Sequence, residues 1–148
     1  MDRSADNHVS VLVKSLDKPG VVAELLENPE IRNDLNRKFG YYTCLQLACQ
    51  NETAEIVRLL LAAGADPFKR DDSIGDTAAH HVIQPPFIEV NEKLAVLLDT
   101  HPVLLEKPDA AGNTLLVDAC YEGLPESVEL LLGKGADTNV GEQCIYSV

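Results

Sequence analysis

Apolar residues gather along this chain in short bursts with helical spacing, and the bursts come in pairs. In the clearest pair, the apolar positions of residues 45–48 and 56–60 are separated by the polar stretch 50–53. Apolar positions three and four residues apart lie on one face of a helix, so the pattern predicts two short antiparallel helices. Neither helix can bury its apolar face alone, and each pair must therefore stack on its neighbours.

The paired pattern recurs along the sequence. Residues 43–66 match residues 114–137 without a gap, because Thr, Leu, Ala, Cys, a Leu-Leu-Leu run and Gly-Ala-Asp all recur in register. Residues 71–83 repeat the first half of the unit, and apolar residues at the same spacing indicate a degenerate copy before residue 38. A period near 33 residues indicates a repeat architecture.

This unit resembles the ankyrin repeat, and the resemblance covers nearly the whole chain. It implies the all-α class, as an ankyrin-repeat solenoid of stacked helix-turn-helix units with short β-hairpin connections. It places one domain at 4–142 and a C-terminal tail at 143–148. The repeats within that domain fall at about 4–37, 38–71, 72–108 and 109–142.

Threonines at equivalent positions open the first helix of three units. We expect Thr43, Thr77 and Thr114 to cap or anchor these helices. In ankyrin proteins a Thr-Pro-Leu-His stretch ties the hairpin turn to the helix. Of the units of this chain, only the third keeps the histidine of that stretch, as His80. The departures imply modest stability.

Charge and composition exclude several functions. The chain has 24 Asp and Glu against 12 Lys and Arg, a formal net charge of −12, which repels nucleic acid and anionic membranes. No apolar run approaches the ~18–20 residues of a membrane span, and the first residues lack the apolar core of a signal peptide. We therefore expect a cytoplasmic protein, with the nucleus as an alternative, and reduced thiols at Cys44, Cys49, Cys120 and Cys144.

A few residues offer candidate chemistry. His80, His81 and His101 are possible metal ligands, but no accompanying ligand motif supports a metal site, and the resemblance assigns His80 to hydrogen bonds with the hairpin backbone. Cys44 lies near a helix start without a positioned base. We expect no cofactor, no metal and no enzyme; a thiol- or metal-dependent sensor or enzyme centred on Cys44, His80 and His81 is the alternative from a different class.

The acidic residues Asp71, Asp72 and Asp76 lack the spacing of a calcium loop and are interpreted as a solvated hairpin tip. The basic doublets 37–38 and 69–70 fall in the predicted hairpins and offer either a surface for an acidic ligand or ordinary solvated tips.

Partner-binding residues follow from the resemblance, because ankyrin proteins bind partners with their hairpin tips and the exposed side of their first helices. Aromatic and large apolar side chains at such positions are typical interface anchors. The matching positions are Phe39, Tyr42, Gln50, Asn51, Ile74, Asp76, Gln84, Asn113, Tyr121 and Glu122.

Two further segments are candidate contact sites. The third unit carries an inserted loop, residues 84–93, with Phe87 and Ile88 on it, either folded back or forming a secondary partner site. The tail ends with Tyr146 and Val148 two positions apart, which resembles a ligand of PDZ domains.

The sequence and the resemblance thus predict a monomeric module that binds another protein through the concave face of the ankyrin stack, as a small inhibitor or adaptor. The alternative is a fragment or isoform of a larger ankyrin-repeat protein.

Overall fold

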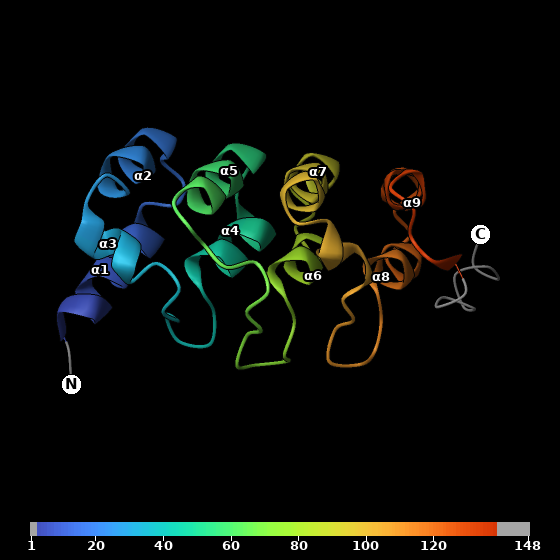
Figure 1. Cartoon of the computed structure of the whole chain (residues 1–148), viewed down its shortest axis with the longest axis horizontal. Coiled ribbons are helices and arrows are strands. Elements are labelled where there is room, and N and C mark those ends of the chain that lie inside the picture. The colour runs from blue at the N-terminus through green and yellow to red at the C-terminus, as the bar shows by residue number, and fades with distance from the viewer. Residues whose placement is uncertain (1–2, 139–148) are drawn as a thin grey trace.

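A computed structural model describes residues 3–138 of the chain. Its helices pair into layers that stack side by side in chain order, with the second helices in one row and the first helices in another (Figure 1). The layers are α1 (Arg3–Lys14), α2 (Pro19–Leu25) and α3 (Pro29–Asn33); α4 (Cys44–Asn51) and α5 (Ala54–Ala62); α6 (Ala78–Val82), α7 (Val90–Thr100) and the 3-10 helix η1 (Pro102–Glu106); and α8 (Leu115–Tyr121) and α9 (Pro125–Gly133). None of these described helices is long and apolar enough to cross a membrane.

The core runs through the stack between the two rows of helices. Leu45 and Ala48 of α4 and Ile56 and Leu60 of α5 are fully buried, as the helical spacing predicts. Because α4 packs against α6, and α5 against α7, each apolar stripe is covered partly by the next layer. Burying a Leu or Ile side chain contributes about 1.5–3 kcal/mol, so the contacts between layers carry much of the stability.

The three threonines begin their helices in three different ways. Thr43 forms a full capping box, because its Oγ1 accepts from the Gln46 backbone N–H and the Gln46 Oε1 accepts from the Thr43 N–H. Thr77 instead directs its hydroxyl to His80 Nδ1. Thr114 lies in the same place, but its buried Oγ1 has no hydrogen-bond partner. The expectation of a cap is confirmed for Thr43, while Thr77 anchors its helix through a side chain.

The β-hairpin connections are not confirmed, although the all-α solenoid is. Within residues 3–138 the only β pairing is an isolated antiparallel bridge between Phe39 and Tyr42. In the following loops, aspartate carboxylates take the place of a strand ladder. Asp71 accepts backbone N–H bonds from Ser73, Ile74 and Gly75, and Asp109 accepts from residues 111 and 113. These turns leave no length over which strands could pair.

The inserted loop is shorter than predicted. Helix α7 begins at Val90, so the last four residues of the segment 84–93 are helical and Lys93 enters the core. The backbone is left-handed at Phe87 (φ 59°) and Glu89 (φ 45°), conformations that non-glycine residues rarely adopt. The loop therefore turns sharply before the helix starts.

Candidate functional site

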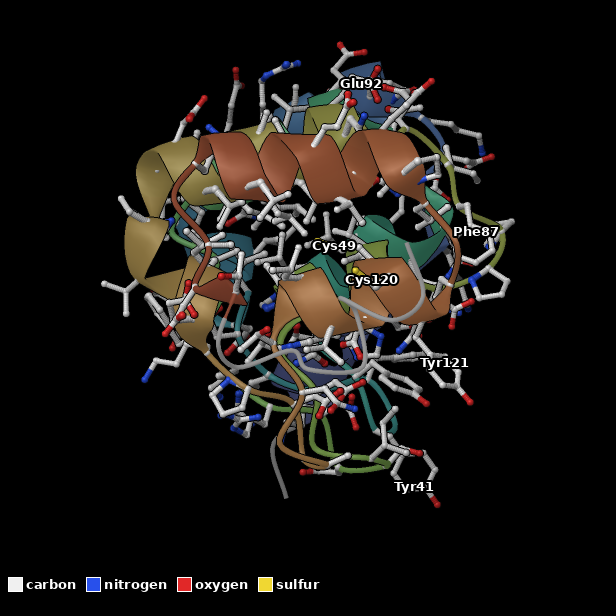
Figure 2. The ribbon with its side chains drawn as sticks, turned by 90° about the vertical axis from the view of Figure 1, so that its right-hand side faces the viewer. Tyr41, Cys49, Phe87, Glu92, Cys120 and Tyr121 are labelled. Carbon is white, nitrogen blue, oxygen red and sulfur yellow. The ribbon has the colours of Figure 1, made fainter. Side chains whose placement is uncertain are left out.

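Large apolar side chains are exposed along the loops and at the end of one first helix. Tyr121, the last residue of α8, is 82% exposed, Tyr41 62% and Ile74 53%. Tyr41 and Tyr121 project from the same side of the stack (Figure 2). The loop that carries Ile74 is joined to Tyr41, because the Asp72 N–H donates to the Tyr41 carbonyl at 2.9 Å. We call these three residues, Tyr41, Ile74 and Tyr121, the loop face.

The predicted aromatic and large apolar residues differ in how far their side chains are exposed to a partner. Ile74 and Tyr121 are exposed and Phe39 is 43% exposed, but Tyr42 is half-buried with its ring edge-on to His81 at 5.5 Å between centroids. Tyr41, which sequence reasoning passed over, is the exposed member of the pair. Tyr41 lies in the turn closed by the Phe39–Tyr42 bridge, and the sequence alone did not show which tyrosine points outward.

The predicted polar positions mostly link parts of the chain to one another. Gln50 donates to the Pro85 carbonyl at 3.2 Å, and Asn51 to the Leu47 carbonyl within its own helix. Gln84 donates to Asp76, which is itself buried, at 3.3 Å. The Asn113 carbonyl lies 3.2 Å from His80 Nε2. Glu122 is fully available, because it is exposed at the end of α8.

Several carboxylates gather beside Tyr121. The pKa of Asp118 is raised to about 8, first by burial, then by the negative charge of Asp109 and a side-chain hydrogen bond with it, and further by Asp76 and Glu122. The pKa of Asp76 is raised as well, by burial and by Asp109. We call Asp76, Asp109, Asp118 and Glu122 the acidic cluster. Its members share one region, and their proximity favours the protonated form of Asp118 at neutral pH, with Asp109 as its hydrogen-bond partner.

His80 borders this cluster but is already engaged. A carbonyl oxygen only accepts hydrogen bonds, so the contact with Asn113 places the proton on Nε2, and Nδ1 accepts from Thr77 at 2.9 Å. Burial lowers the pKa of His80 to about 4, which keeps the ring neutral at pH 7. In the described part of the chain, His80, Asp109 and Asp118 are the group whose ligand atoms converge, within 4.8 Å. In this tautomer Nε2 donates a hydrogen bond, so a metal could bind there only by displacing the proton and the contact with Asn113.

The other histidines are also tied to neighbours. The ring of His81 is buried and donates from Nε2 to Asp71 Oδ2 at 2.7 Å. His101 contacts Thr100 and packs edge-on against Phe68.

The interpretation of the acidic tip as solvated is wrong for Asp71 and Asp76, which are buried, and holds for the exposed Asp72. Asp71 is inside because its carboxylate is the acceptor on which the loop closes.

The cysteines do not share one state. Cys44 and Cys49 are free and buried, but Cys120 is disulfide-bonded, so the expectation of reduced thiols is wrong for that residue. Cys120 lies half-buried in the last turn of α8, whereas the other two are enclosed by the core. Cys144 lies outside the described residues.

Alkylation should distinguish buried from reactive thiols. Burial raises the pKa of both Cys44 and Cys49 to about 12, and only the thiolate reacts quickly. We therefore expect iodoacetamide at pH 7.5 to leave both unmodified in the native protein and to modify both in denaturant, as read by peptide mass spectrometry. Rapid native labelling of Cys44 would support the thiol-dependent alternative instead.

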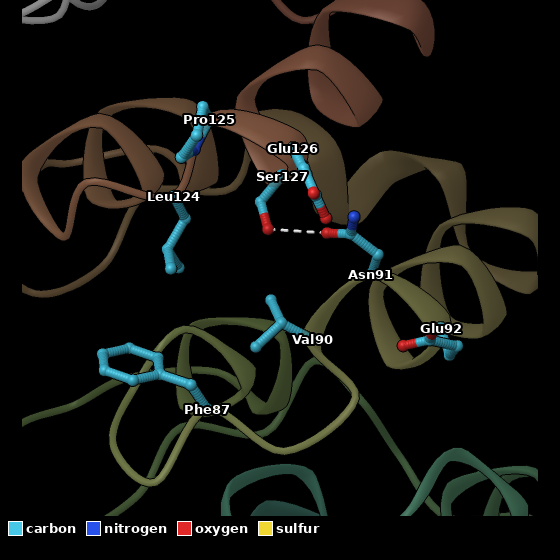
Figure 3. A pocket seen from close by; sticks show the side chains of 8 residues that line it. All are labelled: Phe87, Val90, Asn91, Glu92, Leu124, Pro125, Glu126 and Ser127. Carbon is cyan, nitrogen blue, oxygen red and sulfur yellow. Dashed lines mark hydrogen bonds between the residues drawn. The ribbon is translucent and has the colours of Figure 1, made fainter.

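A groove of about 340 Å³ lies between the inserted loop and the start of α9. Phe87, Val90 and Leu124 form its apolar part, and Ser127 donates to Asn91 at 2.6 Å on its polar side (Figure 3). Phe87 is half-buried here, as is Ile88 beside it. The inserted loop thus partly folds back and leaves a hollow rather than an exposed apolar patch.

The basic doublets mainly make contacts within the chain. Arg37 pairs with Asp34, and Lys38 pairs with Asp72 at 2.6 Å. Lys69 donates to the Asn36 carbonyl, and Arg70 to the Gly75 carbonyl. These contacts favour the interpretation of the doublets as loop tips.

The comparison with known families matches the geometry of the stack. A family model described as ankyrin repeats, three copies, matches residues 45–142. The matched part begins in α4 and includes the layers α4–α5, α6–α7 and α8–α9. Tyr146 and Val148 of the predicted PDZ ligand lie outside both the match and the described residues.

Proposed function

The chain belongs to the ankyrin repeat family, whose repeats generally bind other proteins, and from this premise we propose that it binds a partner protein through its loop face. It acts without catalysis, as a small inhibitor that covers the partner's surface or as an adaptor. In this proposal the chain is a cytoplasmic or nuclear monomer.

The observation that carries the proposal is the exposure of Tyr121 and Tyr41 on one side of the stack. A tyrosine ring that is four-fifths exposed gains little by packing within its own chain. Aromatic residues of this kind supply much of the affinity of protein interfaces, because their large rings lose little conformational entropy on binding. The same face would be available if the chain were part of a longer ankyrin-repeat protein.

The alternative of a thiol- or metal-dependent sensor is less well supported. Cys44 is buried with a raised pKa, and the ring nitrogens of His80 both have partners. His81 donates its Nε2 proton to a hydrogen bond with Asp71. These groups hold the loops and the core, which is sufficient reason for their presence.

Tyr41→Ala combined with Tyr121→Ala should weaken partner binding at least tenfold, because truncating a central interface anchor costs more than about 1 kcal/mol. The measurement is capture from cell extract on the immobilised chain, with the captured proteins quantified by mass spectrometry and the affinity of each hit then determined with purified protein. Val103→Ala in η1 removes an equally exposed apolar side chain elsewhere and should leave binding unchanged.

Three results would contradict the proposal. A partner retained fully by the tyrosine variant, with circular dichroism unchanged, would place the site elsewhere. A partner lost only with Phe87→Ala would move it to the groove at α7 and α9, and one lost only on removal of the last four residues would make the tail the ligand.

A further inference from the structure

The cysteines of the chain differ in their bonding state, and the difference identifies a pair. The sequence has four cysteines, at positions 44, 49, 120 and 144. Cys44 and Cys49 are free thiols enclosed by the core, whereas Cys120 is disulfide-bonded. A disulfide takes one sulfur from each of two cysteines, so within this chain only Cys144 is left to complete the bond of Cys120. Cys144 lies outside the described residues, and its assignment follows from this count.

The chain between the two cysteines is long enough for the bond. Helices α8 and α9 pack against each other and are joined by the short turn 122–124, so the chain has returned towards the start of α8 when α9 ends at Gly133. Figure 1 shows the described segment after α9 ending beside α8. Cys144 follows Thr138, the last described residue, by six positions, which span up to about 20 Å, whereas the seven residues of α8 span about 10 Å. Cys144 is therefore within reach of Cys120.

Cys120 lies on a side of the stack that the described layers leave open. It corresponds to Cys49 in the gap-free match of the second and fourth units. Cys49 is fully buried, because a layer packs on each side of α4 and α5, whereas Cys120 is only half-buried. The same difference separates Val57 from Val128, and Leu132 of α9 is 44% exposed. Among the described residues no layer covers this side of α8 and α9, although the last unit of a repeat stack needs a cover for its apolar side.

We propose that Cys120 and Cys144 form a reversible disulfide, which fastens the C-terminal tail to the open side of the last layer when oxidised and releases it when reduced. The fastened tail then covers α8 and α9 in the way that a following layer covers α4 and α5. No partner protein takes part in this switch, so it does not depend on binding at the loop face.

Thiol–disulfide exchange with glutathione supplies both the oxidant and the reductant. In the oxidising direction, the thiolate of one cysteine attacks a sulfur of oxidised glutathione, and a glutathione thiolate leaves. The thiolate of the second cysteine then attacks the mixed disulfide and displaces the other glutathione. Two protein thiols thereby lose two electrons and two protons, and one glutathione disulfide becomes two glutathione thiols. An excess of reduced glutathione reverses both steps.

The remaining cysteines do not compete for this exchange. Burial raises the pKa of Cys44 and Cys49 to about 12, so neither supplies a thiolate at neutral pH. Cys120 lies in the last turn of α8 and is only half-buried, which makes it the most accessible of the described cysteines to a small thiol such as glutathione. The exchange is therefore selective for one pair.

Peptide mapping without reductant tests the pairing. The full chain is treated with oxidised glutathione, its free thiols are blocked with iodoacetamide, and it is then unfolded and digested with trypsin. Trypsin cuts after Lys134, between the two cysteines, so a linked pair joins peptides 94–134 and 135–148. We expect these joined peptides from a chain that stays monomeric in gel electrophoresis without reductant. Reduced glutathione added to the folded chain should separate them.

The melting temperature tests whether the bond fastens the tail. The oxidised chain should melt about 5–10 °C higher than the reduced chain, because the bond closes a loop that is otherwise free in the unfolded state. Cys144→Ser changes no described residue and should melt like the reduced chain, with or without oxidised glutathione. Ser147→Ala is the matched control, since it alters the tail but leaves both cysteines, and it should keep the full difference.

Four outcomes overturn the proposal. Joined peptides that link Cys120 of two chains, with a dimer in the gel, would make the bond a contact between copies. Free thiols at both Cys120 and Cys144 after oxidised glutathione would refute the pairing. A linked pair that reduced glutathione opens only in denaturant would be a permanent bond and no switch. Equal melting temperatures for the oxidised and reduced chains would show that the bond does not fasten the tail to the last layer.

Discussion

Replacing Asp71 by alanine is expected to lower the free energy of unfolding by about 3–5 kcal/mol. The carboxylate has no exposed surface, accepts N–H bonds from Ser73, Ile74 and Gly75, and receives His81 Nε2 at 2.7 Å. The substitution leaves a buried imidazole and several backbone donors without their acceptor. Urea titration followed by circular dichroism measures the loss.

Asp72→Ala is the matched control, because the neighbouring aspartate is exposed and pairs only with Lys38. A surface pair of this kind contributes about 1 kcal/mol or less. Equal losses for the two variants would show that the Asp71 carboxylate does not hold the loop.

The contribution of Asp71 should also disappear in acid. Burial opposes ionisation, but hydrogen bonds from Ile74, Gly75 and His81 together hold the pKa of Asp71 below its ordinary value. A carboxyl with a lowered pKa in the folded state stabilises the protein above its unfolded pKa and loses that contribution as pH falls through the folded value. The difference between Asp71→Ala and the unaltered chain should therefore shrink below about pH 4, near the unfolded pKa.

Replacing Lys93 by alanine should cost about 3–5 kcal/mol, the second large effect we expect. Lys93 in α7 is fully buried, and its Nζ donates to the Cys49 carbonyl at 2.6 Å. That carbonyl belongs to the last turn of α4, where the helix cannot supply a donor and a positive charge is favoured by the helix dipole. Alanine leaves both a cavity and an unpaired carbonyl. Thermal or urea unfolding measures the total loss of stability from the two effects.

Lys93→Met divides that sum into its two parts. Methionine refills most of the volume but donates no hydrogen bond. It also removes the ammonium group of Lys93, whose pKa is lowered by burial. We expect Lys93→Met to lose clearly less stability than Lys93→Ala. If both variants lose the same amount, the hydrogen bond to Cys49 dominates, and the packing argument for Lys93 is wrong.

The sequence predicted the helices well, because their apolar spacing is regular and repeated. Leu45, Ile56 and Leu60 are buried as expected, since the same pattern recurs in units that must share a core. Lys93 illustrates the opposite case. A lysine is ordinarily exposed, and only the approach of α7 to the end of α4 explains its burial.

The candidate surface was predicted in outline, and particular side chains escaped prediction. Tyr121 stands out as predicted, because a helix position fixes the direction of a side chain. Tyr42, the predicted contact residue, is half-buried, and its neighbour Tyr41 is exposed instead, because the orientation of adjacent residues in a loop depends on backbone contacts made elsewhere. The acidic cluster was missed for a related reason: Asp76 comes from the preceding unit and meets Asp109 and Asp118 only when the layers stack.

The carboxylates of Asp71 and Asp109 fasten the loops before any partner arrives. Loops held in this way have little freedom left to lose, so their ordering adds only a small entropic penalty to association. Most of the conformational cost of forming a complex then falls on the partner's segment. A flexible partner that was stiffened in its bound shape should gain affinity for this chain, whereas further stiffening of the chain itself should gain little.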